Sequence, residues 1–264
     1  MEKNYLTFEG LSKQEMNLVV RLSYYNKYTV SYDEIKKYLP QDNKYIAQLI
    51  YRLKKKKILT PIKRGFYTFN PVNTLAGGRQ VNDFNVGNIF FPNKNYYIGY
   101  YNMFNAYGLT EQIPQMTFIA NTSLSAVKTI SGLQFKFIKV KEECLYGLTT
   151  NKYNGEEVIV SDKERTMVDF VDYWNIKEAQ DKIIEIIKND ECDIKKFIGY
   201  AEKFPKIKVR KFIGVILEKA GIADEMTKDL CDSVKDSAVI SMSKNSRVGE
   251  TNKKWGVIID DTRK

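Results

Sequence analysis

The sequence predicts an α+β fold in two parts: a small N-terminal unit of helices and short strands, then a larger mixed α/β unit with a helical C-terminal part. Three observations lead to this prediction. An amphipathic helical pattern precedes four consecutive lysines, Lys54 to Lys57. Two short strand-like runs follow it around a basic turn. Beyond residue 88, strand-like and helical patterns mix until about residue 162, after which helical patterns dominate.

Two short helices are expected ahead of the lysine run, over residues 12–24 and 32–38. Each begins with a serine that can cap the helix and a glutamate three residues later, which is the spacing of a capping box. The two pairs are Ser12 with Glu15 and Ser31 with Glu34. Pro40 is expected to end the second helix, because a proline disfavours helical backbone in the residue before it.

The third helix, predicted over residues 43–56, has the strongest pattern in the chain. Its apolar residues recur at i, i+3, i+4 and i+7 and therefore share one face. They are Ile46, Leu49, Ile50 and Leu53. The opposite face offers long hydrogen-bond donors and an aromatic ring, side chains that can contact base edges and phosphates in a DNA major groove. Its residues are Lys44, Gln48, Tyr51, Arg52 and Lys55.

A β-hairpin is expected directly after this helix, with strands over residues 58–62 and 66–69 and a basic turn, Lys63-Arg64-Gly65, between them. Three helices followed by a hairpin is the element order of a winged helix-turn-helix, in which the third helix enters the major groove and the hairpin forms the wing. We therefore predict a DNA-binding domain over residues 1–75. Its candidate DNA-binding residues are Lys44, Gln48, Tyr51, Arg52, Lys55, Lys56, Lys63 and Arg64.

The distribution of charge agrees with this prediction. Residues 1–75 contain fourteen lysines and arginines and six acidic residues, an excess of eight, against a net charge of +10 for the whole chain. Net positive charge alone indicates only attraction to polyanions, and a lone lysine run is more often a solvated surface. Concentration of the excess on one predicted helix and wing is typical of a nucleic-acid interface.

The composition excludes several kinds of site. The chain has no histidine, so hydrolysis by a serine or cysteine assisted by histidine is excluded. The three cysteines are far apart and form no CxxC pair, which predicts neither a zinc site nor a disulfide framework. No Walker lysine loop, GxGxxG or nuclease-type carboxylate cluster occurs. We therefore expect no catalytic residues, no metal and no cofactor.

The chain has no apolar run near the ~18 residues of a membrane span and no signal peptide, which favours a cytoplasmic location and no membrane partner.

Residues 76–264 are predicted to form a second α+β domain, joined to the first by a linker around Gly77-Gly78 within residues 70–88. Strands are expected over residues 89–91, 116–120, 135–140, 158–160 and 255–259. Helices are expected over residues 96–107, 163–173, 177–188, 194–203, 209–220 and 224–234. At the start of the helix 163–173, Asp162 can act as the cap, and Arg165 and Asp169 form an i, i+4 pair expected on the helix surface or at an interface.

Several motifs of this second part resemble the AbiEi-type antitoxin family. Residues 97–110, YIGYYNMFNAYGLT, followed by Gln112-Ile113-Pro114, resemble its strand–helix unit with a Gly-Leu-Thr turn. Residues 160–169, VSDKERTMVD, resemble its D-x-E-R-T-L-x-D helix start, and Arg247-x-Gly249 with residues 254–257 resembles its closing strand. Many relatives carry a histidine before the Gly-Leu-Thr turn, where this chain has Tyr107.

This resemblance implies the antitoxin of a type IV toxin–antitoxin pair. The winged helix would repress the shared promoter, a double-stranded DNA expected to contain inverted repeats. The second domain would counteract a nucleotidyltransferase-like toxin without forming a stable complex with it. Two alternatives remain: a stand-alone transcription factor whose second domain senses a ligand or dimerises, and a nuclease-like enzyme guided by the winged helix. The identity of the neighbouring gene would distinguish the antitoxin from the stand-alone transcription factor. Metal-dependent cleavage of nucleic acid would support the nuclease-like enzyme.

Overall fold

The computed structural model describes residues 10–27, 29–39, 42–70, 83–130, 132–153, 156–242 and 248–259. The chain divides into two compact units, one of residues 1–89 with 129–134 and the other of residues 90–128 with 135–264. Helices and several separate sheets occur together, so the fold is α+β, as predicted. The expected domain boundary at residue 75, the Gly77-Gly78 linker and Arg247 lie outside the described residues.

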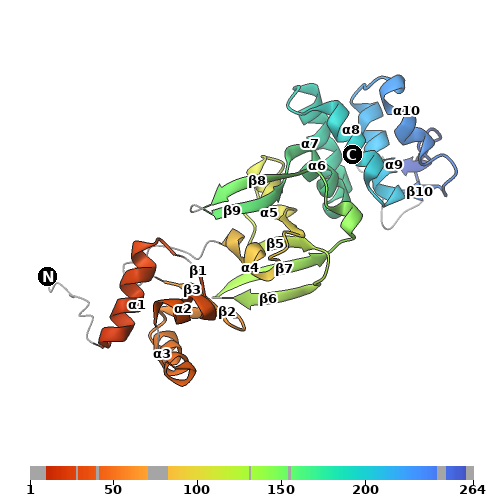
Figure 1. The fold of residues 1–264 in the computed structure, drawn as a ribbon. Coiled ribbons are helices and arrows are strands. Elements are labelled where there is room, and N and C mark those ends of the chain that lie inside the picture. Colours follow the sequence, from red (N-terminus) through yellow and green to blue (C-terminus); the bar gives the residue numbers. More distant parts are fainter. Residues whose placement is uncertain are drawn as a thin grey trace. The chain divides into compact units, whose positions relative to one another are not determined.

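The N-terminal unit contains the three predicted helices and the predicted hairpin (Figure 1). In chain order its elements are α1 (Lys13–Tyr24), β1 (Thr29–Ser31), α2 (Tyr32–Tyr38), α3 (Asn43–Lys55), β2 (Leu59–Lys63) and β3 (Phe66–Phe69). The strand β1 was not predicted, because three residues carry too little alternation to be recognised. It pairs antiparallel with β3, which gives a three-stranded sheet in the order β1-β3-β2. Pro40 lies outside the described residues.

Local hydrogen bonds explain why these helices begin where they do. Ser12 Oγ accepts a bond from Glu15 N at 3.3 Å, and Ser12 N donates to Glu15 Oε2 at 2.8 Å, which completes the first capping box. Ser31 and Glu34 form the second in the same way, at 3.1 and 2.9 Å. Asp42 caps α3 by accepting a backbone N–H bond of 2.8 Å. Each cap satisfies N–H groups that a helix start otherwise leaves without partners.

The helices of the N-terminal unit enclose one apolar core, and the predicted apolar face of α3 is its centre. All four residues of that face are buried, as predicted. The buried apolar residues are Leu18, Val19, Leu22, Val30, Ile35, Leu39, Ile46, Leu49, Ile50, Leu53, Ile58, Leu59 and Phe69. Because one whole side of α3 is buried, the side of the helix that faces outward is fixed.

A six-stranded sheet follows, in the strand order β6-β7-β5-β4-β9-β8. Its strands are β4 (Tyr96–Ile98), β5 (Met116–Asn121), β6 (Ala126–Ile130), β7 (Leu133–Lys139), β8 (Leu148–Tyr153) and β9 (Glu156–Ser161). The central strand β4 runs antiparallel to β5 and parallel to β9, and β8 and β9 form an antiparallel pair. The strands predicted over residues 116–120 and 158–160 are confirmed as parts of β5 and β9, and the strand predicted over residues 135–140 is confirmed as part of β7 except for its last residue.

Two predictions near this sheet were wrong. Residues 89–91 were expected to form a strand and residues 70–88 a linker, but a 3-10 turn (Asp83–Asn85) and helix α4 (Val86–Phe90) occupy most of the described part. Residues 96–107 were expected to form one helix. They form β4 and then α5 (Tyr101–Ala106), because the backbone turns at Tyr100, whose φ of +53° no right-handed helix contains.

The strands β6 and β8 were missed for a different reason. They are the two edges of the sheet, and most of their residues are exposed or half-buried. An edge strand that faces solvent contains few apolar residues, so it lacks the apolar run or strict alternation by which a strand is recognised in sequence.

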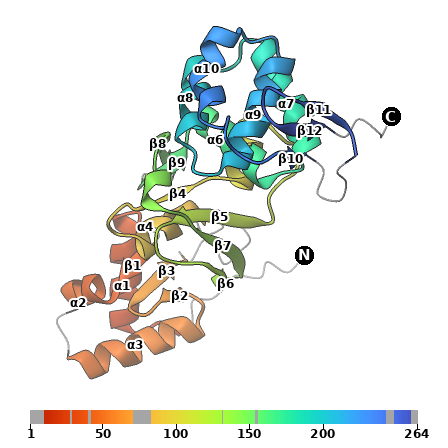
Figure 2. The ribbon, with the colours of Figure 1, turned by 90° about the vertical axis from the view of Figure 1, so that its right-hand side faces the viewer.

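The five C-terminal helices agree with the prediction to within two residues at each end. They are α6 (Lys163–Tyr173), α7 (Ile176–Lys188), α8 (Ile194–Lys203), α9 (Ile207–Lys219) and α10 (Asp224–Asp232). A small sheet in the order β10-β12-β11 accompanies them (Figure 2), with strands β10 (Ile240–Ser241), β11 (Glu250–Asn252) and β12 (Val257–Ile259). The last strand was predicted over residues 255–259 but begins two residues later, at Val257, because Trp255 and Gly256 belong to a turn.

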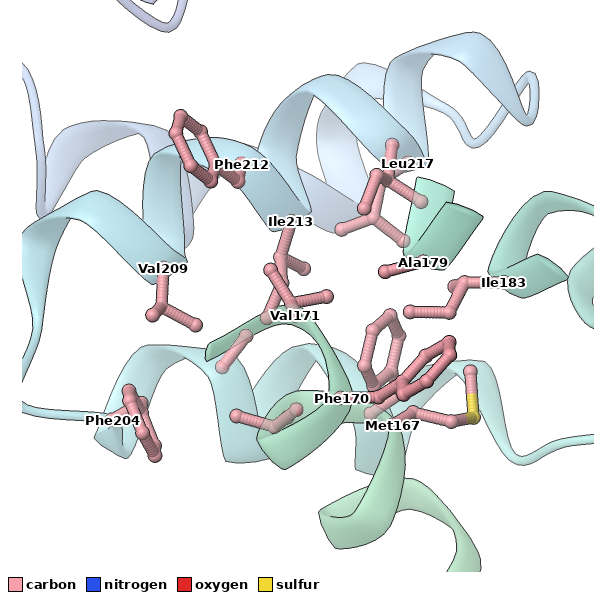
Figure 3. Packing of buried hydrophobic residues seen from close by; sticks show 14 of the residues in the cluster. Met167, Phe170, Val171, Ala179, Ile183, Phe204, Val209, Phe212, Ile213 and Leu217 are labelled. Carbon is pink, nitrogen blue, oxygen red and sulfur yellow. The ribbon is translucent and has the colours of Figure 1, made fainter. Parts of the chain in front are cut away.

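The core of this unit takes many of its buried residues from α6, α7, α8 and α9. Figure 3 shows their side chains meeting, among them Phe170, Ile183 and Ile213. Trp255, predicted to be a packing residue, is buried against α9, and its indole Nε1 donates to Glu218 Oε2 at 2.8 Å. Its ring lies directly over Gly214, so a Cβ atom there would lie 2.1 Å from the indole.

We expect the substitution Gly214→Ala to destabilise the chain by about 1–3 kcal/mol, because a buried indole held by hydrogen bonds cannot move aside at low cost. The matched control is Gly199→Ala in α8, where nothing lies within 4 Å of an added Cβ. That change should stabilise the chain by about 0.5–1 kcal/mol, the usual gain when alanine replaces a helical glycine. Urea unfolding followed by the fluorescence of Trp174 and Trp255 measures both. Equal effects of the two substitutions would contradict the described packing.

Candidate nucleic-acid interface

The outer face of α3 presents a continuous polar stripe. Four of the predicted DNA-binding residues are exposed and recur at i, i+4, i+7 and i+11, so they lie in one line along the helix. They are Lys44, Gln48, Tyr51 and Lys55. The Tyr51 side chain is 56% exposed, and the Lys55 ammonium lies 5.0 Å from the centre of its ring. We call these four residues the α3 stripe.

Arg52 and Lys56 lie on the flank of the helix beside this stripe and are held by a residue of α1. The Nε atom of Arg52 donates to Glu15 Oε1 at 2.9 Å, and the Nζ atom of Lys56 donates to Glu15 Oε2 at 2.7 Å. Lys56 also bonds the carbonyl oxygen of Gly10. The Glu15 side chain is only 1% exposed, whereas those of Arg52 and Lys56 are 40% and 33% exposed. Two of the eight predicted residues are therefore partners of a buried carboxylate.

The electrostatic balance at Glu15 favours its charged form. Burial alone raises the pKa of a carboxyl group, but the hydrogen bonds from Lys56, from the backbone of Ser12 and from Arg52 outweigh it. The pKa of Glu15 therefore lies below its ordinary value. One negative charge faces two positive ones at this point, which leaves the flank of α3 with less free positive charge than the sequence indicates.

The predicted wing residues also differ from each other. Arg64 is exposed in the turn between β2 and β3, which Gly65 closes with a φ of +78°. Lys63 is half-buried: its ammonium bonds the carbonyl oxygen of Ile89 and lies 4.7 Å from the Phe66 ring. Burial lowers the pKa of Lys63. Of the two, Arg64 is the one placed to contact a partner from solution.

Sequence reasoning missed the pairing of Glu15, although a signal was present. Leu18, Val19 and Leu22 are buried on the core-facing side of α1, and Glu15 precedes them at i−3, i−4 and i−7. A carboxylate in line with a buried apolar face needs a cation. In the sequence the capping box was a sufficient explanation for Glu15, so its pairing with cations was not predicted.

The Asp-Lys-Glu-Arg-Thr segment of the second unit, residues 162–166, connects the start of α6 to α8. Asp162 caps α6 and accepts a bond of 3.0 Å from the hydroxyl of Tyr200 in α8. Glu164 accepts bonds from Asp193 N at 3.1 Å and from Lys196 Nζ at 3.1 Å. These contacts fix the start of α6 to α8.

Arg165 and Asp169 are fully buried and do not lie on the surface of α6. The Arg165 guanidinium donates to Asp169 Oδ1 at 2.9 Å, to the Tyr97 hydroxyl at 2.9 Å and to the Cys144 carbonyl at 2.8 Å. It lies 4.5 Å from the centre of the Tyr146 ring. A buried charge is tolerated only with such complete pairing.

Tyr107, which precedes the Gly-Leu-Thr turn, donates its hydroxyl to the carbonyl oxygen of Ser161 at 3.1 Å. Among the described residues, no group of three or more Cys, Asp or Glu side chains is arranged to hold a metal ion. None of the helices in the described ranges combines the length and the apolar character that a membrane span requires.

No protein-family model matches this chain, and no curated protein matches it. A solved structure does. The crystal structure of the RV2827C protein from Mycobacterium tuberculosis is similar over 95% of this chain and 92% of that chain, with a TM-score of 0.66 and 10% sequence identity. At that identity the similarity concerns the fold alone, and it extends over nearly the whole length of both proteins.

The pairing of Glu15 predicts how stability changes with pH. Because the pKa of Glu15 is lowered in the folded chain, its contribution is complete above the ordinary glutamate range near ~4.3 and is lost as the pH falls through the folded pKa. The variant Glu15→Gln should therefore lose less stability between pH 5 and pH 3 than the wild type. Urea unfolding at several pH values, followed by far-UV circular dichroism, measures this. Parallel curves for the two proteins would contradict the pairing.

Proposed function

We propose that this chain is a DNA-binding transcriptional repressor that contacts promoter DNA through the α3 stripe. One observation carries the proposal: four exposed donor and aromatic side chains lie in line on a helix whose opposite side is wholly buried. The order α1-β1-α2-α3-β2-β3, with the sheet order β1-β3-β2, supports a winged helix-turn-helix in which α3 is the recognition helix.

The residues divide into three roles in this proposal. Lys44 and Gln48 lie on the first half of α3 and contact base edges, since glutamine can pair with adenine and lysine with guanine in the major groove. Lys55 and Arg64 contact phosphates. Arg52 and Lys56, which the sequence placed in the interface, act mainly as partners of Glu15.

The AbiEi resemblance supports a second part of the proposal. The chain would be the antitoxin of a type IV system in the cytoplasm, and its second unit would counteract a nucleotidyltransferase-like toxin encoded beside it. Asp162 and Glu164 hold the start of α6 to α8 and Arg165 is buried, so the motif has a structural role in this unit. The surface that acts on the toxin would then lie outside the motif.

The polar cluster of the second unit supports a non-catalytic role. Lys196 bonds both Asp162 Oδ2 at 3.2 Å and Glu164 Oε2 at 3.1 Å. Burial lowers the pKa of this lysine, but the two carboxylates outweigh burial and raise it above its ordinary value. A lysine held charged in this way is a poor nucleophile and a poor general base.

We expect Gln48→Ala to weaken binding to the chain's own upstream DNA by about 1–3 kcal/mol with little effect on unrelated DNA, because it removes a contact to a base. Arg64→Ala should weaken binding to both alike and reduce the salt slope by about one, because it removes a phosphate contact. Gel shifts over a range of salt concentrations measure both. Lys195→Ala, an exposed lysine of α8, is the charge-matched control and should behave as wild type. Unchanged binding in a Lys44→Ala/Gln48→Ala variant would exclude α3 as the recognition helix.

The antitoxin part is tested with the full chain and a toxin expressed from an unrelated promoter. The Lys44→Ala/Gln48→Ala variant should lose repression of the upstream promoter in a reporter assay yet relieve growth inhibition as well as wild type does, because repression and counteraction belong to different units. If the folded variant lost both activities, relief would depend on DNA binding, and the antitoxin role of the second unit would be contradicted.

A further inference from the structure

We infer that Glu15 limits non-specific DNA binding by holding Arg52 and Lys56 away from the phosphates at the flank of the α3 stripe. The inference rests on the proposed function and adds a residue that sets its sequence discrimination. Glu15 is a positioning residue in this scheme, since it acts through two cations and touches no DNA itself.

The carboxylate is fixed from both sides. On its own helix, Glu15 Oε2 accepts a bond of 2.8 Å from Ser12 N, and Glu15 N donates to Ser12 Oγ. On the other side, Oε1 accepts from Arg52 of α3 and Oε2 from Lys56, the residue that follows the last turn of α3. With the side chain 1% exposed, a phosphate from solution cannot replace the carboxylate in these bonds.

The two cations would otherwise add to a strongly basic helix end. Arg52 and Lys56 are four residues apart on one flank of α3, and Lys54, Lys55 and Lys57 beside them are all exposed. The side chains of Arg52 and Lys56 are a third or more exposed, so without Glu15 they could extend toward a DNA backbone. The structure instead directs the Nε of Arg52 and the Nζ of Lys56 inward.

The consequence follows from how proteins bind DNA. Phosphate contacts raise affinity for every sequence, because they release counterions regardless of the bases. Specificity is the difference between two affinities. On the chain's own duplex the base contacts fix the register of the protein, whereas on a random duplex the protein can shift until both cations reach phosphates. Unpaired Arg52 and Lys56 would therefore raise the affinity for the random duplex more. By pairing Arg52 and Lys56, Glu15 increases the share of the binding free energy that the base contacts of the α3 stripe contribute.

The test uses the full chain with Glu15→Gln, which keeps the shape of the side chain but removes its charge. The matched control is Glu34→Gln, which alters the other capping-box glutamate, whose cation is Lys27 and not a residue of α3. Fluorescence anisotropy at several NaCl concentrations measures binding to the chain's own upstream duplex and to a random duplex of equal length.

We expect Glu15→Gln to bind the random duplex more tightly and to steepen its salt slope by up to about two, at roughly 0.9 for each new phosphate contact. The affinity ratio between the two duplexes should fall, and Glu34→Gln should match wild type. Adding Arg52→Gln and Lys56→Gln to Glu15→Gln should reverse the steepening, which a purely structural role of Glu15 would not do.

An unchanged or shallower slope in folded Glu15→Gln would overturn the inference while leaving the proposed function intact. Wild-type protein that bound neither duplex would overturn both. Should Glu15→Gln fail to fold, single substitutions in the wild type decide the matter. Arg52→Gln and Lys56→Gln should each reduce the salt slope by less than Lys55→Gln does, and equal reductions would overturn the inference.

Discussion

A carboxylate buried between two helices must be paired, because an isolated charge removed from water costs several kcal/mol. Glu15 meets this requirement with Arg52 of α3, with Lys56 directly after α3 and with the backbone of Ser12, and in doing so joins α1 to the end of α3. The apolar face of α3 already fixes which side of the helix is buried. Glu15 adds a fixed point on its flank, so the orientation of the α3 stripe follows from one apolar face and one buried ion pair.

The second unit applies the same physical rule at a different place. The Arg165 guanidinium is 1% exposed and is satisfied by Asp169, the Tyr97 hydroxyl and the Cys144 carbonyl. These partners come from three separate segments of the chain, so the guanidinium connects α6 to β4 and to the turn before β8. The motif that resembles that of AbiEi antitoxins therefore contributes to the core of the fold, and in the proposed antitoxin role the surface that acts on a toxin would lie outside the motif.

The parts of the fold that local chemistry determines could be predicted from the sequence. Serine caps with glutamates three residues later defined α1 and α2, and apolar periodicity defined α3 and the five C-terminal helices. The elements that were missed or wrongly predicted lie where the sequence has no local signal, or has a signal that fits two different structures. Strand β1 has only three residues, β6 and β8 are exposed sheet edges, and the sharp turn at Tyr100 divides what had the pattern of one helix.

The candidate site was predicted only in part for a related reason. The α3 stripe follows from helical periodicity, so Lys44, Gln48, Tyr51 and Lys55 were placed on one exposed face. The partner of Arg52 lies 37 residues earlier in the chain, and no spacing rule reaches that far. Likewise, an i, i+4 pair such as Arg165 with Asp169 has the same spacing on a surface as in a core, so its burial depends on elements that the pattern does not include.

Amide hydrogen exchange with and without the chain's own upstream duplex tests the central claim most directly, because it locates the interface without any substitution. Binding through the α3 stripe predicts added protection in α3 and in the β2–β3 turn at Arg64, with none in α6 to α10 beyond that caused by a random duplex. Added protection confined to the second unit, with α3 unchanged, would contradict the account.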